Sequence, residues 1–233
     1  MWLNLFACLL LAHLIADFAL QTDRTCKDKV EKKWHSPYQY VHAIIVFVLS
    51  WLAACELGFW WCALIIGIIH LGIDIGKSYF EEKLSLFVVD QILHILIMAS
   101  VAHLWCRINC WNLPFNISLH YIVIAGAILT CWKPANIFIK MILKYHQVSI
   151  PEENNESFNS GALIGTLERW IIVIFICLQR YESIGLLIAA KSIIRFSEKD
   201  TAKTEYVLAG TLLSIFIAVL AGLVIRAVAA GQS

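Results

Sequence analysis

The sequence contains little charge, and the charge it has shows no clear excess of either sign. Asp, Glu, Lys and Arg make up 15% of the 233 residues, and the formal net charge is +1. A soluble domain usually carries roughly a quarter charged residues. The low charge therefore argues against a soluble globular domain, and the near-zero balance gives no indication of a nucleic-acid partner.

A cleavable signal peptide is also not expected. No basic residue precedes the first apolar run, residues 2–20, and no small-residue cleavage site follows it. His13 and Asp17 lie inside this run, and the apolar core of a signal peptide would tolerate them poorly. We therefore expect the run to be retained as a membrane-spanning helix.

The eight cysteines lack the pattern of a disulfide framework. Most of them lie in or next to apolar runs, where a thiol behaves as a small hydrophobic side chain. Cys106 and Cys110 share a short loop and would be able to pair if that loop were periplasmic. Separate, reduced thiols are the favoured interpretation.

Long apolar runs dominate the sequence instead. Hydrophobic residues make up 60% of the chain, and the mean hydropathy is +0.75. The runs lie at 2–20, 41–57, 60–79, 86–105, 117–132, 163–178, 184–196 and 205–228. Most approach the roughly 20 residues that a helix needs to cross the hydrocarbon, and only 184–196 is short. We predict an all-α integral membrane helix bundle with seven or eight transmembrane helices, and we favour eight.

The spacing of these runs divides the chain into three parts. Residues 1–105 form a four-helix part, residues 106–160 a middle part, and residues 161–233 a C-terminal transmembrane part. Within the middle part, residues 133–146 have the pattern of an amphipathic segment at the membrane interface. Residues 147–160 have the composition of a loop or linker.

The basic residues indicate how the chain is oriented. They concentrate in alternate loops, at Arg24, Lys27, Lys29, Lys32, Lys33, Lys77, Lys83, Lys133, Lys140, Lys144, Lys191, Arg195, Lys199 and Lys203. The opposite loops contain only Arg107, Arg180 and Arg226. Because basic loops stay on the cytoplasmic side, we predict a multi-pass inner-membrane protein with both termini outside.

Seven ionisable residues lie inside the first four predicted helices: His13, Asp17, His42, His70, Asp74, Asp90 and His94. Three pairs are spaced i, i+4, which places each pair on one face of its helix. The order changes from HxxxD to DxxxH where the predicted helix direction inverts. The carboxylates and His42 therefore lie within about one turn of the cytoplasmic boundary, and the other histidines lie about 6 Å deeper.

These residue types at matched depth indicate a metal site. Cofactor sites in helix bundles are built from inward-facing carboxylate and imidazole side chains. Such ligands suit zinc best here, with iron or manganese as alternatives. We predict His13, His70 and His94 as main ligands, and Asp17, Asp74 and Asp90 as ligands or general base. His42 is an extra ligand or a proton shuttle. The alternative is that the groups only form Asp–His hydrogen bonds between helices.

A second polar set lies in the C-terminal part and consists of Glu168, Arg169, Lys191 and Arg195. One interpretation is a basic rim that binds the phosphate or headgroup of a lipid substrate. The other is structural: the basic side chains reach toward the interface, and Glu168 pairs with one of them.

Six motifs together resemble one family. They are AHLIADFALQ (12–21), HLGID followed by Lys77 (70–77), DQILH (90–94), IGTLERWII (164–172), AAKSIIRF (189–196) and EYVLAGTLLS (205–214). They resemble the uncharacterised bacterial and phage membrane family known as domain of unknown function 3307. The resemblance implies that the His/Asp positions and the later basic segments belong to one recurring design, but it implies no activity. The His/Asp pattern also looks like that of ceramidase-like enzymes and of small inner-membrane hydrolases with HxxxD helices, although neither full motif is present.

Three hypotheses for function follow. The leading one is a membrane-embedded, metal-dependent hydrolase that acts on a lipid or amphipathic substrate at the cytoplasmic leaflet. The second is a transporter or proton relay that uses the same residues, and the absence of a repeat counts against it. The third is a non-enzymatic membrane scaffold that recruits a soluble partner.

Overall fold

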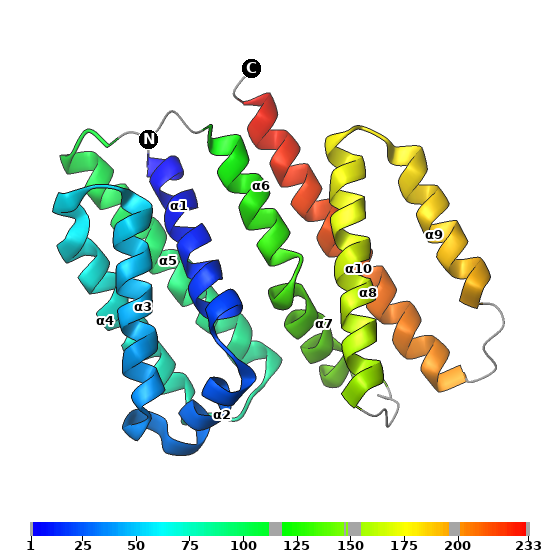
Figure 1. Cartoon of the computed structure of the whole chain (residues 1–233), viewed down its shortest axis with the longest axis horizontal. Coiled ribbons are helices and arrows are strands. Elements are labelled where there is room, and N and C mark those ends of the chain that lie inside the picture. Colours follow the sequence, from blue (N-terminus) through cyan, green and yellow to red (C-terminus); the bar gives the residue numbers. More distant parts are fainter. Residues whose placement is uncertain (1, 112–117, 147, 149–154, 196–200, 232–233) are drawn as a thin grey trace. The chain divides into compact units, whose positions relative to one another are not determined.

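The computed structural model describes residues 2–111, 118–146, 148, 155–195 and 201–231, without the side chains of 155–160, 194–195 and 201–204. All regular secondary structure in these ranges is helical, which confirms the predicted all-α class (Figure 1). The chain divides into two compact units, Met1–Gly126 and Ala127–Ser233. The predicted middle part, 106–160, is shared between them.

The first unit is a bundle of four long helices with shorter helices attached. Its elements are α1 (Trp2–Leu14), η1 (Ile15–Leu20), α2 (Asp23–Lys32), η2 (Lys33–His35), α3 (Pro37–Ala54), η3 (Leu57–Phe59), α4 (Trp60–Lys77), α5 (Leu84–Ile108) and most of α6 (Leu119–Thr130). Helix α1 packs against α3 and α5, and α4 also packs against α3 and α5. The four long helices therefore surround one axis, which is the condition for their polar side chains to meet.

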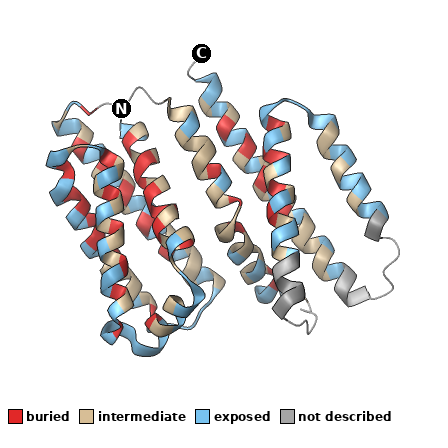
Figure 2. Cartoon of the chain, viewed as in Figure 1, coloured by how far each residue is buried: buried red, intermediate tan, exposed pale blue. Residues whose placement is uncertain are grey.

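Apolar side chains fill the interior of this bundle and also cover its outside. Leu5, Leu9, Val46, Phe59 and Ile66 are among the buried core residues. Many other large apolar side chains on the same helices are exposed, and Figure 2 shows exposed residues along their outer faces. A helix that is apolar on all sides is typical of a buried or membrane-spanning position.

Helices α3 and α4 approach closely at Gly67. A Cβ atom added there would lie 3.1 Å from the Phe47 Cβ and 3.2 Å from the Ala43 carbonyl oxygen. Small residues at such contacts let helix backbones come together in membrane proteins.

The segment after the first apolar run, predicted as a basic loop between two spans, contains a short helix. Thr22 and Thr25 form a reciprocal capping box that starts α2. The helix ends where Lys33 adopts a positive φ of 55°. Because α2 is polar, no apolar run predicts it. A capping box nevertheless stabilises the first turn of a helix whatever the hydropathy of the rest.

The second unit contains α7 (Lys133–Tyr145), α8 (Asn155–Cys177), α9 (Tyr181–Arg195) and α10 (Thr201–Ala230). Helices α8 and α10 are in close contact at Gly222, where an added Cβ would lie 2.9 Å from the Ile176 Cβ. Helix α8 begins at Asn155, inside the predicted linker 147–160, and residues 149–154 of that linker lie outside the described residues. Asn and Ser occur in helix first turns as readily as in loops.

In the part of the chain that the structure describes, five helices are long and apolar enough to cross a membrane: Trp2–Ala19, Pro37–Ala54, Leu57–Lys77, Leu84–Ile108 and Glu205–Ala230. Helices α6 and α7 together pass the same test as a pair bent by 43°, which gives six. The predicted interfacial segment 133–146 is thus a helix that continues a short apolar one across a bend.

Candidate metal centre

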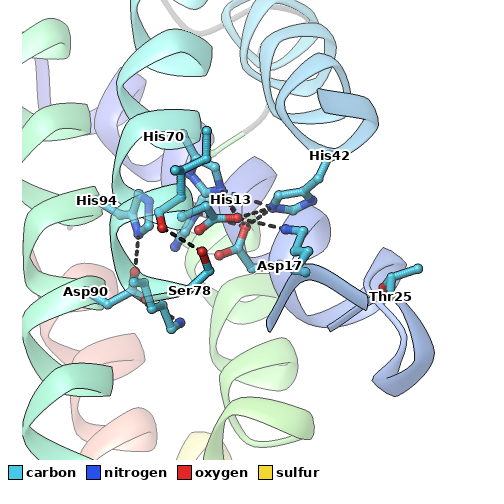
Figure 3. A network of polar contacts seen from close by, with 12 residues as sticks. His13, Asp17, Thr25, His42, His70, Ser78, Asp90 and His94 are labelled. Carbon is cyan, nitrogen blue, oxygen red and sulfur yellow. Dashed lines mark hydrogen bonds and ion pairs between the residues drawn. The ribbon is translucent and has the colours of Figure 1, made fainter. Parts of the chain in front are cut away.

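Four chain segments bring the seven predicted ionisable residues to one end of the first bundle. They are His13 at the end of α1, Asp17 in η1, His42 in the second turn of α3, His70 and Asp74 near the end of α4, and Asp90 and His94 in the first half of α5. The structure brings these helices together, a point that spacing along the sequence leaves open. Figure 3 shows the resulting network of side chains.

Asp17 lies on an unusual backbone. Residues Ile15–Leu20 form a π-helix that continues α1. π-helical turns are rare and are often found at functional sites, because the wider turn shifts a side chain away from its α-helical direction. Here the π-turn holds the Asp17 carboxylate, and three imidazoles lie close to it.

Two imidazoles and the Asp17 carboxylate form a compact set of donor atoms. The Nε2 atoms of His42 and His70 are 3.0 Å apart. They lie 3.3 Å and 3.6 Å from Asp17 Oδ1. In a tetrahedral zinc site with bonds of 2.0–2.2 Å, ligand atoms are separated by about 3.3–3.5 Å. The Asp17–His42–His70 set, the primary set, therefore has the spacing of three zinc ligands.

Asp74 adjoins the primary set but already has a cationic partner. Its Oδ2 lies 3.8 Å from the Nε2 atoms of both His42 and His70. Lys29 of α2 donates to the same oxygen at 2.8 Å. Asp74 is also the most solvent-accessible of the seven side chains, at 13%.

Asp90 is neutralised in the same way. Lys77 donates to Asp90 Oδ2 at 2.7 Å, and Gln91 donates to the same oxygen at 3.1 Å. Among the described residues, Asp17 has no lysine or arginine within ion-pair distance. A buried carboxylate needs a compensating charge. A metal ion among the primary set would supply it.

His13 and His94 lie beside the primary set. The ring centroid of His94 is 4.1 Å from that of His70 and 5.1 Å from that of His13. His13 Nδ1 lies 3.5 Å from Asp17 Oδ1. One donor atom each from His13, Asp17 and His94 lie within 4.8 Å of one another, and so do donor atoms from His70, Asp74 and His94.

Several of these buried atoms make no hydrogen bond within the described chain. They are Asp17 Oδ1, Asp90 Oδ1 and both ring nitrogens of His94. A buried polar atom without a partner costs about 1–3 kcal/mol. Imidazole nitrogens and carboxylate oxygens are ligands for zinc, iron and manganese. The residues present therefore fit a divalent metal ion.

The structure changes how the predicted residues are ranked. His42, predicted as an extra ligand, belongs to the most compact donor set, whereas Asp74 and Asp90 are held by lysines. Lys29 and Lys77 were not predicted as partners of these aspartates. Lys77 follows Asp74 by three residues, a spacing that would indicate Asp74 as its partner rather than Asp90. Lys29 carries no such signal, because its helix was predicted as a loop.

The predicted substrate-binding residues lie in the second unit. Lys191 donates to Glu168 at 2.5 Å, which is the pairing that the structural interpretation predicts. The side chain of Arg195 lies outside the described residues. Arg169 is only 1% exposed. It donates to Cys131 O at 2.7 Å, Ser214 Oγ at 2.8 Å, Asn136 Oδ1 at 2.5 Å and Thr166 Oγ1 at 3.1 Å.

Comparisons with curated proteins and with solved structures found no significant match. A family model described as "Protein of unknown function (DUF3307)" matches residues 5–123, just over half of the 233 residues. The matched region contains all seven residues of the His/Asp cluster and none of the second polar set. The chain therefore belongs to the DUF3307 family of proteins of unknown function.

Proposed function

We propose that the protein is a membrane-embedded, metal-dependent hydrolase whose substrate is a lipid or another amphipathic molecule at the cytoplasmic leaflet. The observation that supports this most directly is the primary set. Three donor atoms from three different helical segments lie 3.0–3.6 Å apart in a buried site. In this proposal, Asp17, His42 and His70 bind a zinc ion.

The site also contains groups suited to the chemistry of hydrolysis. A zinc ion with three protein ligands keeps a fourth position for water and lowers the pKa of that water toward neutrality. Asp74 is the candidate general base, because it lies beside both Nε2 atoms and is the most accessible carboxylate. Lys29 is the residue that orients it, through the 2.8 Å contact.

The site is proposed to open toward the cytoplasmic side of an inner membrane. The α2 helix, which contributes Lys29, belongs to the most basic inter-helix segment, residues 21–36. In this topology, α8 and α9 are additional spans, and the total is seven or eight. The basic segments are cytoplasmic and both termini are outside.

Three native cysteines test this topology. Cys26 lies on α2, whereas the exposed Cys55 and Cys110 lie at the opposite ends of α3 and α5. In spheroplasts of cells that express single-cysteine variants, a membrane-impermeant maleimide should label Cys55 and Cys110. Cys26 should react only after permeabilisation, and slowly, because burial raises the pKa of its thiol. Labelling of Cys26 alone in intact spheroplasts would reverse the proposed orientation.

Metal removal tests the proposed activity. Untagged, detergent-purified protein should contain zinc, iron or manganese, and it should hydrolyse at least one member of a panel of ester, amide and phosphodiester lipids. Treatment with a chelator should abolish product release, and zinc addition should restore it. A protein that binds no metal, or whose hydrolysis is unaffected by complete metal removal, contradicts the proposal.

A proton- or metal-ion pathway is the second candidate, supported by the contiguous imidazoles. The ring centroids of His42, His70, His94 and His13 follow one another at 4.1–5.1 Å. Reconstituted liposomes would show zinc or proton flux that depends on His70 if this candidate is correct. If the His/Asp residues can be replaced without loss of metal binding, hydrolysis or flux, the scaffold hypothesis stands instead.

A further inference from the structure

The cluster contains more metal-ligand atoms than one ion requires. Figure 3 shows His42 and Asp17 on one side of His70, and His94 with Asp90 on the other. His94 is nearly enclosed by protein, with 3% of its side chain exposed, yet neither ring nitrogen has a hydrogen-bond partner among the described residues. The primary set uses neither His94 nor Asp90.

The hydrogen bonds around Gln91 determine which ring nitrogen of His13 is available to bind a metal ion. The Gln91 amide nitrogen donates to Asp90 Oδ2, so its oxygen is the atom that faces His13 Nε2 at 3.4 Å. That oxygen only accepts hydrogen bonds, so in a neutral His13 the proton is on Nε2. Nδ1 is then a lone pair facing Asp17 Oδ1 at 3.5 Å. Two electron-rich atoms at this distance repel each other, and a cation between them would remove the repulsion.

Asp90 has one oxygen available in the same region. Lys77 and Gln91 both donate to Oδ2, whereas Oδ1 makes no hydrogen bond. This Oδ1 lies 3.7 Å from His94 Nδ1, which is too far for a hydrogen bond but close to the separation of two ligands of one ion.

We propose that the cluster binds a second divalent cation through His13, His94 and Asp90, with the Asp17 carboxylate shared between the two ions. The inference rests on the proposed function and deepens it. In two-metal hydrolases the ions are about 3.5–4 Å apart and stabilise both the attacking and the leaving oxygen. The overlap of the donor groups at Asp17 suits such a pair.

The positive charge of Lys77 should weaken binding of the second ion. Lys77 neutralises Asp90, and 37% of its side chain is exposed. A second ion takes over the role of counter-ion to Asp90 and competes with this lysine. Removing the Lys77 charge should therefore strengthen binding of the second ion, whereas a purely structural Lys77–Asp90 pair predicts no such gain.

Metal stoichiometry tests the inference. Untagged protein in detergent is equilibrated with excess zinc, passed through a desalting column and analysed for metal and protein. We expect two ions per chain in the parent and one in each of the His94→Ala and His42→Ala variants. His103→Ala is the matched control on α5, with an exposed imidazole, and should keep two. In a zinc titration, Lys77→Gln should lower the dissociation constant of the second ion about tenfold.

The outcomes separate the two proposals. One ion per chain in the parent at saturating zinc overturns the second site and leaves the proposed function intact. No bound ion overturns both. If His94→Ala does not fold, as judged by size-exclusion chromatography, His94→Gln and the Lys77→Gln titration decide the question, and an unchanged or weaker second site in Lys77→Gln counts against the inference.

Discussion

Replacing His70 by alanine is expected to remove the metal ion of the primary set and to eliminate hydrolysis. His70 is the central residue of the cluster: its Nε2 contacts His42 at 3.0 Å and Asp17 at 3.6 Å, and its ring also adjoins those of His13 and His94. Loss of a group that merely orients a metal ligand weakens affinity 10–100-fold. Loss of a direct ligand should therefore raise the metal dissociation constant by at least about 100-fold.

The measurement is elemental analysis combined with the lipid-hydrolysis assay on the same preparations. His70→Asn keeps a polar side chain of smaller size and checks that the loss does not come from a packing defect. It should fold and still lack the ion of the primary set. His103→Ala is the control variant, and its metal content and activity should match those of the parent. A His70→Ala protein that retains the metal content and the activity of the parent would remove His70 from the site and the primary set with it.

Replacing Arg169 by leucine is expected to destabilise the second unit by about 3 kcal/mol. The guanidinium joins the α6–α7 turn, α7, α8 and α10 through four hydrogen bonds. Leucine would leave the Cys131 carbonyl, Asn136 and Ser214 without these bonds in a buried region. Lysine keeps the charge but lacks the planar fork, so Arg169→Lys should recover only part of the stability.

Thermal unfolding in detergent measures this effect, with an expected lowering of the Tm by about 6–12 °C. Arg180→Leu, at an exposed position after α8, is the control and should change stability by less than about 0.5 kcal/mol. If Arg169→Leu is as stable as the parent but loses hydrolysis, Arg169 has the predicted role in substrate binding rather than a structural one.

The apolar runs are a sufficient guide to the long helices of this protein. Within the described residues, each of the eight predicted runs lies mainly on a helix or on a helix and its π-helical extension, because a helix satisfies the backbone hydrogen bonds of an apolar segment in an apolar solvent. The apolar runs do not predict the polar α2 helix, because its formation depends on a local cap and on the Lys29–Asp74 contact.

The candidate site was only partly predictable. The i, i+4 spacing of His70 with Asp74 places both on one helix face, and it also places Asp90 with His94 on the face of another. It does not determine which side chains from different helices meet. The rotation of each helix and the π-turn at Asp17 decide that His42, rather than His13 or His94, completes the most compact donor set.

By itself, the sequence determined the helical class, the family and the identity of the seven ionisable residues inside the apolar runs. These depend on composition and on periodicity along one helix, which are local properties. Only the tertiary structure decided that Lys29 and Lys77 neutralise two of the three aspartates, and that among the described residues no lysine or arginine pairs with Asp17. Those pairings depend on distances of a few ångströms between helices, and such distances arise from the packing of whole helix faces rather than from spacing along the chain.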